Sequence, residues 1–199
     1  MRVCPSNGLQ PAMFASRANF GGKLSPVLVS RRGPCESDCN LCGMICPTGA
    51  IRGLSLVEKR WAKIGTAVVH HGRCLAWNNS KSCVVCQEVC PYGAVNILPR
   101  ASAAVLTGGA YADESQYPVP VINAAKCFGC GYCEQHCPTE VTSIIVEPLA
   151  ALRLTTGSYE ETGKERGLQL DLVDKSATPE SLFPMEELPE GTLPPGFTD

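Results

Sequence analysis

Three cysteine runs, each ending in a cysteine that is followed directly by proline, constrain this chain more than any other feature. In each run the last three cysteines are spaced C-x2-C-x3-C, and three, eight or two residues separate the first cysteine from them. The runs are Cys35, Cys39, Cys42 and Cys46; Cys74, Cys83, Cys86 and Cys90; and Cys127, Cys130, Cys133 and Cys137. This repetition predicts three loops that bind the same kind of metal group.

The spacing favours [4Fe-4S] clusters. The third run, ending at Cys137-Pro138, has the spacing with which bacterial ferredoxins hold such a cluster. Two intervening residues let a loop turn three thiolates onto neighbouring irons, and the fourth cysteine then faces away. In two-cluster ferredoxins it ligates the other cluster, and the following proline fixes the exit of the chain.

Other uses of cysteine fit the pattern less well. Structural zinc is usually bound by two separated pairs or with histidines, and not by three runs that each end in Cys-Pro. Secreted disulfide scaffolds are usually shorter and carry an even number of cysteines. This chain has 13 cysteines in 199 residues.

The thirteenth cysteine, Cys4, also precedes a proline. The steps from Cys4 to Cys46, on to Cys90 and on to Cys137 are 42, 44 and 47 residues. The regular period predicts that Cys4 is the last ligand of a fourth run, with three further cysteines upstream of Met1 in a longer natural protein. The alternative is an unrelated N-terminal cysteine.

Composition narrows the function classes. Only 6% of residues are aromatic, with 16 Pro and 19 Gly, so we expect clusters to replace part of the core and metal binding to be coupled to folding. The net charge of −2 argues against nucleic acid as a partner. No stretch approaches the roughly 18 apolar residues of a membrane span, and no export signal is visible.

The predicted fold class is α+β: tandem bacterial-ferredoxin-like [4Fe-4S] units, rich in loops, with a disordered C-terminal tail. Residues 1–150 are predicted to form the polyferredoxin domain, followed by an extension over 151–172 and a proline-rich acidic tail over 173–199. Within the domain we expect an inner pair over 31–100. An outer unit is expected over 119–149 together with 1–12.

Each unit shows a similar order of predicted elements. A β-branched run leads in, a cysteine loop follows, and an apolar strand leaves. The predicted lead-in strands are 26–30, 66–71 and 119–123, and the exit strands are 94–98 and 143–147. Apolar residues at helical spacing predict a connecting helix over 54–64, and 101–118 is expected to be an exposed loop.

With the ligands placed, the chain resembles the NapG/MauM-type polyferredoxins over about Cys4 to Leu149. The features that carry the resemblance are the stretch 65–69 leading to Cys74-Leu75-Ala76-Trp77, the run from Cys83 to Pro91, and the segment from Cys127 to Cys133. The Cys-Pro runs alone occur in many ferredoxins, whereas the eight-residue step after Cys74 and the order of the units are more particular to this group. The resemblance implies four clusters in the full-length protein, three of them in this chain.

Related four-cluster proteins pair the inner two runs with each other and the outer two with each other, and the resemblance implies the same ligand sets here. One cluster would take Cys35, Cys39, Cys42 and Cys90, and a second Cys74, Cys83, Cys86 and Cys46. The third would take Cys127, Cys130, Cys133 and Cys4, which leaves Cys137 for the missing fourth cluster. The competing arrangement closes the third cluster with Cys137 and leaves Cys4 over.

These observations predict a non-catalytic protein that relays single electrons through several [4Fe-4S] clusters, as a component of a respiratory or membrane-linked redox chain. The resemblance implies a redox donor and acceptor as partners, one of them a membrane quinol-linked module, and favours an extracytoplasmic location. Two alternatives stay open: a cluster-bearing subunit of a larger oxidoreductase, and a redox or iron sensor. No phosphate-binding glycine loop or further ligand set points to a substrate site.

Overall fold

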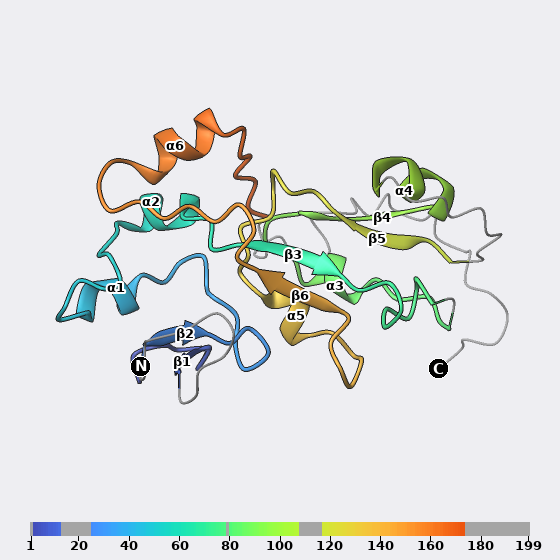
Figure 1. The fold of residues 1–199 in the computed structure, drawn as a ribbon, viewed down its shortest axis with the longest axis horizontal. Helices are drawn as coiled ribbons and strands as arrows, with labels where there is room; N and C mark the ends of the chain where they lie inside the picture. The colour runs from blue at the N-terminus through green and yellow to red at the C-terminus, as the bar shows by residue number, and fades with distance from the viewer. Residues whose placement is uncertain (1, 13–24, 79, 108–116, 174–199) are drawn as a thin grey trace, which may run out of the picture.

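The computed structural model describes residues 2–12, 25–78, 80–107 and 117–173 of the chain. The chain folds into short helices and short antiparallel strands joined by many loops (Figure 1). In chain order the elements are β1 (Leu9–Pro11), β2 (Pro26–Leu28), α1 (Leu41–Ile45), α2 (Leu56–Trp61), β3 (Thr66–Val69), α3 (Val85–Glu88), β4 (Val95–Leu98), α4 (Arg100–Thr107), β5 (Val119–Ile122), α5 (Tyr132–Gln135), β6 (Ile144–Glu147) and α6 (Tyr159–Glu165).

The strands form three two-stranded antiparallel ladders. β1 pairs with β2, β3 with β6, and β4 with β5. The strand that leads into the second cysteine run therefore pairs with the strand that leaves the third, with Val69 opposite Ile144. The strand that leaves the second run pairs with the one that leads into the third, with Val95 opposite Ile122. The second and third units are interlocked through both ladders.

Three very short helices carry the third cysteine of each run. Cys42 lies in α1, Cys86 in α3 and Cys133 in α5. Each helix is four or five residues long, and a Cys-Pro pair follows it within a few residues, where proline cannot continue the helical hydrogen bonding. α3 and α5 contact each other. α1 lies at the other end of the molecule, near β1 and β2 (Figure 1).

Helices α2 and α6 pack together on one side of the molecule. Each begins with the pattern Ser-x-x-Glu, and the N-cap oxygen of Ser55 or Ser158 accepts a hydrogen bond from the amide three residues on, at 3.3 Å in both helices. At Gly163 a Cβ would lie 2.9 Å from the Trp61 ring, so only glycine allows this close approach. These contacts hold the C-terminal extension against the cysteine-bearing region.

The core is small and contains several of the cysteines. The main cluster packs Tyr92 and Phe128, whose rings stack at 4.9 Å, with Ile144 and four buried cysteines of the third run. A second cluster surrounds Trp77 and includes Cys74. Cysteines thus occupy positions that larger apolar side chains fill in other proteins of this size, as the low aromatic content led us to expect.

Most predicted elements agree with the structure. β2, β3, β4, β5, β6 and α2 all lie within the ranges predicted for them. The expectation of a loop over 101–118 was wrong in its first part, because Arg100–Thr107 form α4. Alanine is the best helix former, and Ala101, Ala103 and Ala104 start this helix. The predicted tail over 173–199 lies outside the described residues from 174 onward.

Candidate metal centres

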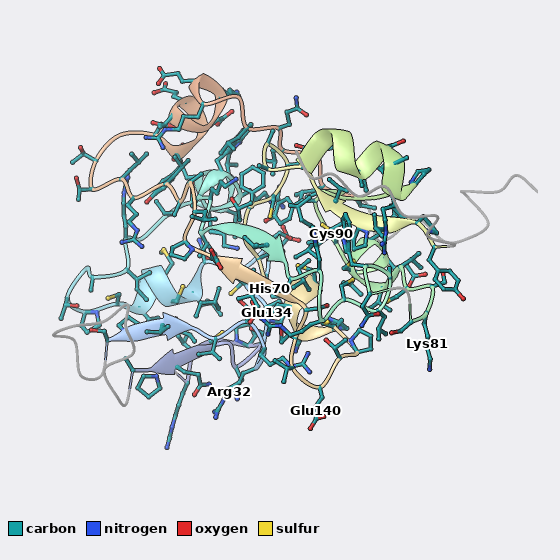
Figure 2. All side chains as sticks on the ribbon, turned by 45° about the vertical axis from the view of Figure 1, so that its right-hand side comes forward. Arg32, His70, Lys81, Cys90, Glu134 and Glu140 are labelled. Carbon is teal, nitrogen blue, oxygen red and sulfur yellow. The ribbon has the colours of Figure 1, made fainter. Side chains whose placement is uncertain are left out.

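Two cavities in the structure are each lined by four cysteines. The Cys74 cavity is lined by Cys74, Cys83, Cys86 and Cys137. The Cys127 cavity is lined by Cys90, Cys127, Cys130 and Cys133. In each cavity three cysteines come from one run and the fourth is the last cysteine of the other run. Figure 2 labels Cys90 near β5, on the side of the molecule where the two ladders and α3 meet.

This exchange follows from the strand pairing. Because β3 pairs with β6 and β4 with β5, the Cys-Pro end of each run is carried to the three-cysteine loop of the other. The contact between α3 and α5 brings Cys86 and Cys133 to the two sides of the same junction. Charges at Cys90 and at Cys86 both act on Cys133, whose pKa is raised well above its usual range, chiefly by burial.

The grouping differs from the one expected from the resemblance, which the structure does not reproduce. Cys46 was expected beside Cys74, but Cys137 lines that cavity. Cys4 was expected beside Cys127, but Cys90 lines that cavity. In both cavities the fourth cysteine comes from another run, but the two runs that share a cavity are not the pair expected from the resemblance.

The first run lies beside Cys4. Burial raises the pKa of Cys35, and negative charges at Cys42 and Cys4 act in the same direction. The Ser6 hydroxyl donates to the carbonyl oxygen of Pro34, and the amide of Val29 donates to Gly8 at 2.8 Å. These bonds hold the Cys4 loop against the start of the first run, and we call Cys4, Cys35, Cys39 and Cys42 the Cys35 group.

Cys46 stands apart from both cavities. It does not line either of them, and it follows α1, whose Met44 and Ile45 side chains are 64% and 61% exposed. Hydrogen bonds from the Ile51 amide and the Thr48 hydroxyl lower the pKa of Cys46 to about 7. The exposed apolar face of α1 contrasts with α3 and α5, which contact each other.

The last cysteine of each run has the same local hydrogen bonding. Backbone amides point at the sulfur atoms of Cys46, Cys90 and Cys137; the donors are Ile51 at 3.4 Å, Ala94 at 3.3 Å and Ser143 at 3.4 Å. Such N–H groups stabilise a negatively charged sulfur and tune the potential of any cluster bound to it. At all three positions an amide is thus placed to stabilise a thiolate.

At three of the four Cys-Pro positions a side-chain hydroxyl also contacts the cysteine sulfur. These contacts were not predicted from the sequence. Cys4, Cys46 and Cys137 each contact the hydroxyl oxygen two residues on, at 3.4, 3.6 and 3.0 Å. The partners are Ser6, Thr48 and Thr139. The sequence pattern Cys-Pro-Ser/Thr could have indicated them. Cys90-Pro91 is followed by Tyr92, which departs from this pattern.

Cys137 has the richest set of hydrogen bonds. Burial opposes its ionisation, but the Ser143 and Thr139 hydroxyls and neighbouring amides lower the pKa of Cys137 to about 7. Its backbone is also held, because the Arg31 guanidinium donates to the carbonyl oxygens of Cys137 at 2.9 Å and Thr139 at 3.2 Å. Arg31 belongs to the first unit, so that unit fixes the end of the third run.

Tyr92 lines the Cys127 cavity. Burial raises the pKa of Tyr92 above its usual range, and charges at Cys130 and Cys35 act in the same direction. Its ring is 3% exposed and stacks on Phe128. The two rings therefore form a buried wall of the Cys127 cavity.

The chemistry of these donor sets fits [4Fe-4S] clusters. Burial and neighbouring charges raise the pKa of Cys86 and of Cys130 to about 12, so four thiolates at one cavity need positive charge, which iron supplies. Within the described residues no three His, Cys, Asp or Glu side chains lie close enough to share one metal ion. Four thiols around a cavity suit four irons, whereas a zinc ion needs all its ligands at about 2.3 Å.

All 13 cysteines lie in the described part of the chain, and none of them forms a disulfide. In the described residues no helix has the length and apolar character needed to cross a membrane.

Comparisons with known proteins give consistent results. A domain family described as "4Fe-4S dicluster domain" matches residues 81–141, which contain seven of the eight cysteines that line the two cavities. The chain is 32% identical over 149 residues to the methylamine utilization ferredoxin-type protein MauM of Methylobacillus flagellatus, with 73% of this chain and 57% of the relative covered. MauM of Methylorubrum extorquens is also 32% identical, over 151 residues, with 74% and 62% covered.

The ferredoxin-type protein NapG of Haemophilus influenzae is 26% identical over 200 residues, with 96% of this chain and 65% of the relative covered. The chain thus spans between 57% and 65% of the length of these relatives. No solved structure matches the chain.

Proposed function

From the premise that this chain is a NapG/MauM-type ferredoxin, we propose that it relays single electrons through several [4Fe-4S] clusters. The observation that carries the proposal is the pair of cavities, each lined by four cysteines from two runs. When bound, such clusters supply one-electron chemistry at potentials between about −700 and +450 mV. The protein contributes thiolates, hydrogen bonds to sulfur and shielding from water.

Three clusters are proposed for this chain, with revised ligands. Cys74, Cys83, Cys86 and Cys137 hold the first, and Cys90, Cys127, Cys130 and Cys133 hold the second. The third is held by Cys4, Cys35, Cys39 and Cys42. The shared cavities support the first two sets, and the closeness of Cys4 to Cys35 supports the third.

Cys46 is proposed as a ligand of a fourth cluster whose other three thiolates come from a further cysteine run of the full-length protein. Its sulfur accepts an amide hydrogen bond as Cys90 and Cys137 do. The exposed side chains of Leu41, Met44 and Ile45 on α1 offer the face on which a second short helix would pack, as α5 packs on α3.

The domain organisation follows from the same pairing. We propose that residues 66–147 form one two-cluster unit of tandem ferredoxin-like halves, and that residues 2–12 with 25–54 form part of a second. Helix α2 and the extension that contains α6 brace the two units from one side (Figure 1).

We propose that the partners of this relay are a redox donor and a redox acceptor. That one of them is a membrane quinol-linked module is proposed from the resemblance. The extracytoplasmic location has the same basis. Exposed charged side chains near the runs, such as Arg32 and Glu140, extend from the surface (Figure 2) and are available for docking. We propose no substrate chemistry for the chain itself.

The direct test is anaerobic reconstitution followed by iron and acid-labile sulfide analysis and by EPR of the reduced protein. The proposal predicts about twelve irons per chain with interacting [4Fe-4S] signals. Stoichiometric zinc, or iron without acid-labile sulfide, would contradict it.

A further inference from the structure

Lys63 is a fully buried cation that the ligand assignment does not use. It lies in the connector between α2 and β3, and only 2% of the residue is exposed. Its ammonium group donates a hydrogen bond to the carbonyl oxygen of Ala124 at 2.6 Å. Lysine is almost never fully buried unless its charge is compensated, so this position requires an explanation.

The connector that carries Lys63 runs alongside the Cys127 loop. The amide of Ile64 donates to the carbonyl oxygen of Phe128 at 2.9 Å, and the amide of Ala67 points at the sulfur of Cys127 at 3.3 Å. Gly129 fits against Gly65 so closely that a Cβ would lie 2.6 Å from the Gly65 nitrogen. These contacts fix the backbone of Lys63 close to the Cys127 cavity.

No carboxylate among the described residues forms an ion pair with Lys63, whereas Arg60, Lys126 and Lys164 each pair with an acidic side chain at the surface. Burial lowers the pKa of Lys63, and a negative charge at Cys127 opposes this change. The negative charge that acts on the ammonium is therefore that of Cys127. An uncompensated buried charge is strongly destabilising.

We propose that Lys63 is the internal counter-ion of the cluster held by Cys90, Cys127, Cys130 and Cys133, and that it raises the reduction potential of this cluster. The inference rests on the proposed function, because it needs that cluster. Reduction adds one electron and hence one negative charge to the cluster, so a fixed nearby ammonium stabilises the reduced form more than the oxidised form. In a water-poor interior this stabilisation is weakly screened.

The test compares reconstituted variants by EPR-monitored redox titration. Lys63→Met replaces the cation by an apolar side chain of similar length, and Lys63→Gln keeps a hydrogen-bond donor without the charge. Lys63→Arg keeps the charge. Lys81→Met is the matched control, because Lys81 is an exposed lysine beside the second run.

We expect both neutral variants to shift the reduced-to-oxidised ratio of one cluster about tenfold toward the oxidised form at a given ambient potential, which is about 59 mV for a one-electron couple. Lys63→Arg and Lys81→Met should leave all potentials close to the wild type. The shift should persist at high salt, because a buried charge is little screened.

Unchanged potentials in Lys63→Gln, or an equal shift in the potential of every cluster, would overturn the counter-ion role. Neither result would contradict the presence of the clusters. Absence of [4Fe-4S] signals in the wild-type protein would instead contradict the proposed function. If Lys63→Met does not retain its clusters, Lys63→Gln and Lys63→Arg still decide the question, since only one of them keeps the charge.

Discussion

The backbone amide of Cys35 donates a hydrogen bond to the carbonyl oxygen of Cys130 at 2.7 Å. One of these cysteines belongs to the Cys35 group and the other to the Cys127 cavity, so two proposed clusters are connected by a single hydrogen bond between ligand residues. Ser30, which lies shortly before Cys35, also contacts Gly131, the residue after Cys130. In the proposed relay this junction would set the distance over which electrons pass between the first unit and the interlocked pair.

Substituting Gly131 should break this junction. Its φ is 88°, and a Cβ would lie 2.5 Å from the Ser30 Cβ. Gly131→Ala therefore combines backbone strain of about 1–2 kcal/mol with overpacking of about 1–3 kcal/mol. We expect a lower thermal unfolding midpoint and partial loss of iron from the reconstituted protein.

Gly157→Ala is the matched control, because Gly157 has a φ of 83° with no atom within 4 Å of a Cβ placed there. Gly157→Ala should lower the thermal unfolding midpoint only by the effect of backbone strain. Equal decreases of the unfolding midpoint in the two variants would contradict the close contact between Gly131 and Ser30.

The hydroxyl of Thr139 should raise the potential of the cluster that Cys137 holds. Thr139→Val removes this donor to sulfur at nearly constant volume, and we expect reduction of that cluster to become less favourable by about 0.5–1.5 kcal/mol, the usual net value of a hydrogen bond. Thr139→Ser should retain the wild-type potential. Redox titration followed by EPR measures the change.

Thr48→Val is the control for this experiment, since Thr48 holds the same position after Cys46. In this chain Cys46 is assigned to none of the three clusters, so the variant should leave all their potentials unchanged. A shift in Thr48→Val as large as in Thr139→Val would show that Cys46 ligates one of these clusters after all.

Glu58 should make the docking of α6 depend on pH. Its carboxylate accepts hydrogen bonds from the Ser158 hydroxyl at 2.7 Å and from the Tyr159 amide, and the Ser158 bond above all holds the pKa of Glu58 below its usual range. A lowered folded-state pKa stabilises the contact above the unfolded value of about 4.3, and this stabilisation is lost as the pH falls through the folded value.

Amide hydrogen exchange over Tyr159–Glu165, corrected for intrinsic rates, measures this effect. The wild type should lose protection as the pH falls below about 4.3, and Glu58→Gln should show little protection at any pH. Glu160→Gln should behave as the wild type, since Glu160 pairs with Lys164 within the helix. If the exchange protection of the wild type stays constant across this pH range, the role of Glu58 in docking α6 is contradicted.

Much of the local structure could be predicted because its signals are local. The lead-in and exit strands were predicted from β-branched and apolar runs on either side of the cysteine loops. Helix α2 was predicted from apolar residues at helical spacing. Helix α6 was missed although Ser158-x-x-Glu161 marks its start, because its mostly polar residues show no clear apolar stripe. Its stability comes from Glu58 and Trp61, which lie about 100 residues away.

Strand partners could not be predicted in this way. β3 is rich in β-branched residues, as a strand should be, but nothing in Thr66–Val69 specifies that β6 is its neighbour. The ligand sets depend on that pairing, which is why Cys90 and Cys137 were first placed with other cysteines. Lys63 was missed for a related reason, since its burial results from contacts with residues 124–129.

The central claim, that the second and third runs exchange their last cysteines, is tested most directly by iron and acid-labile sulfide analysis of two matched variants, Cys137→Ala and Cys46→Ala. Each removes one thiolate that precedes a Pro-Thr pair. We predict that Cys137→Ala loses about four irons per chain together with the EPR signal of one cluster, whereas Cys46→Ala keeps the wild-type content. The reverse result, with iron lost from Cys46→Ala and retained in Cys137→Ala, would contradict the exchange.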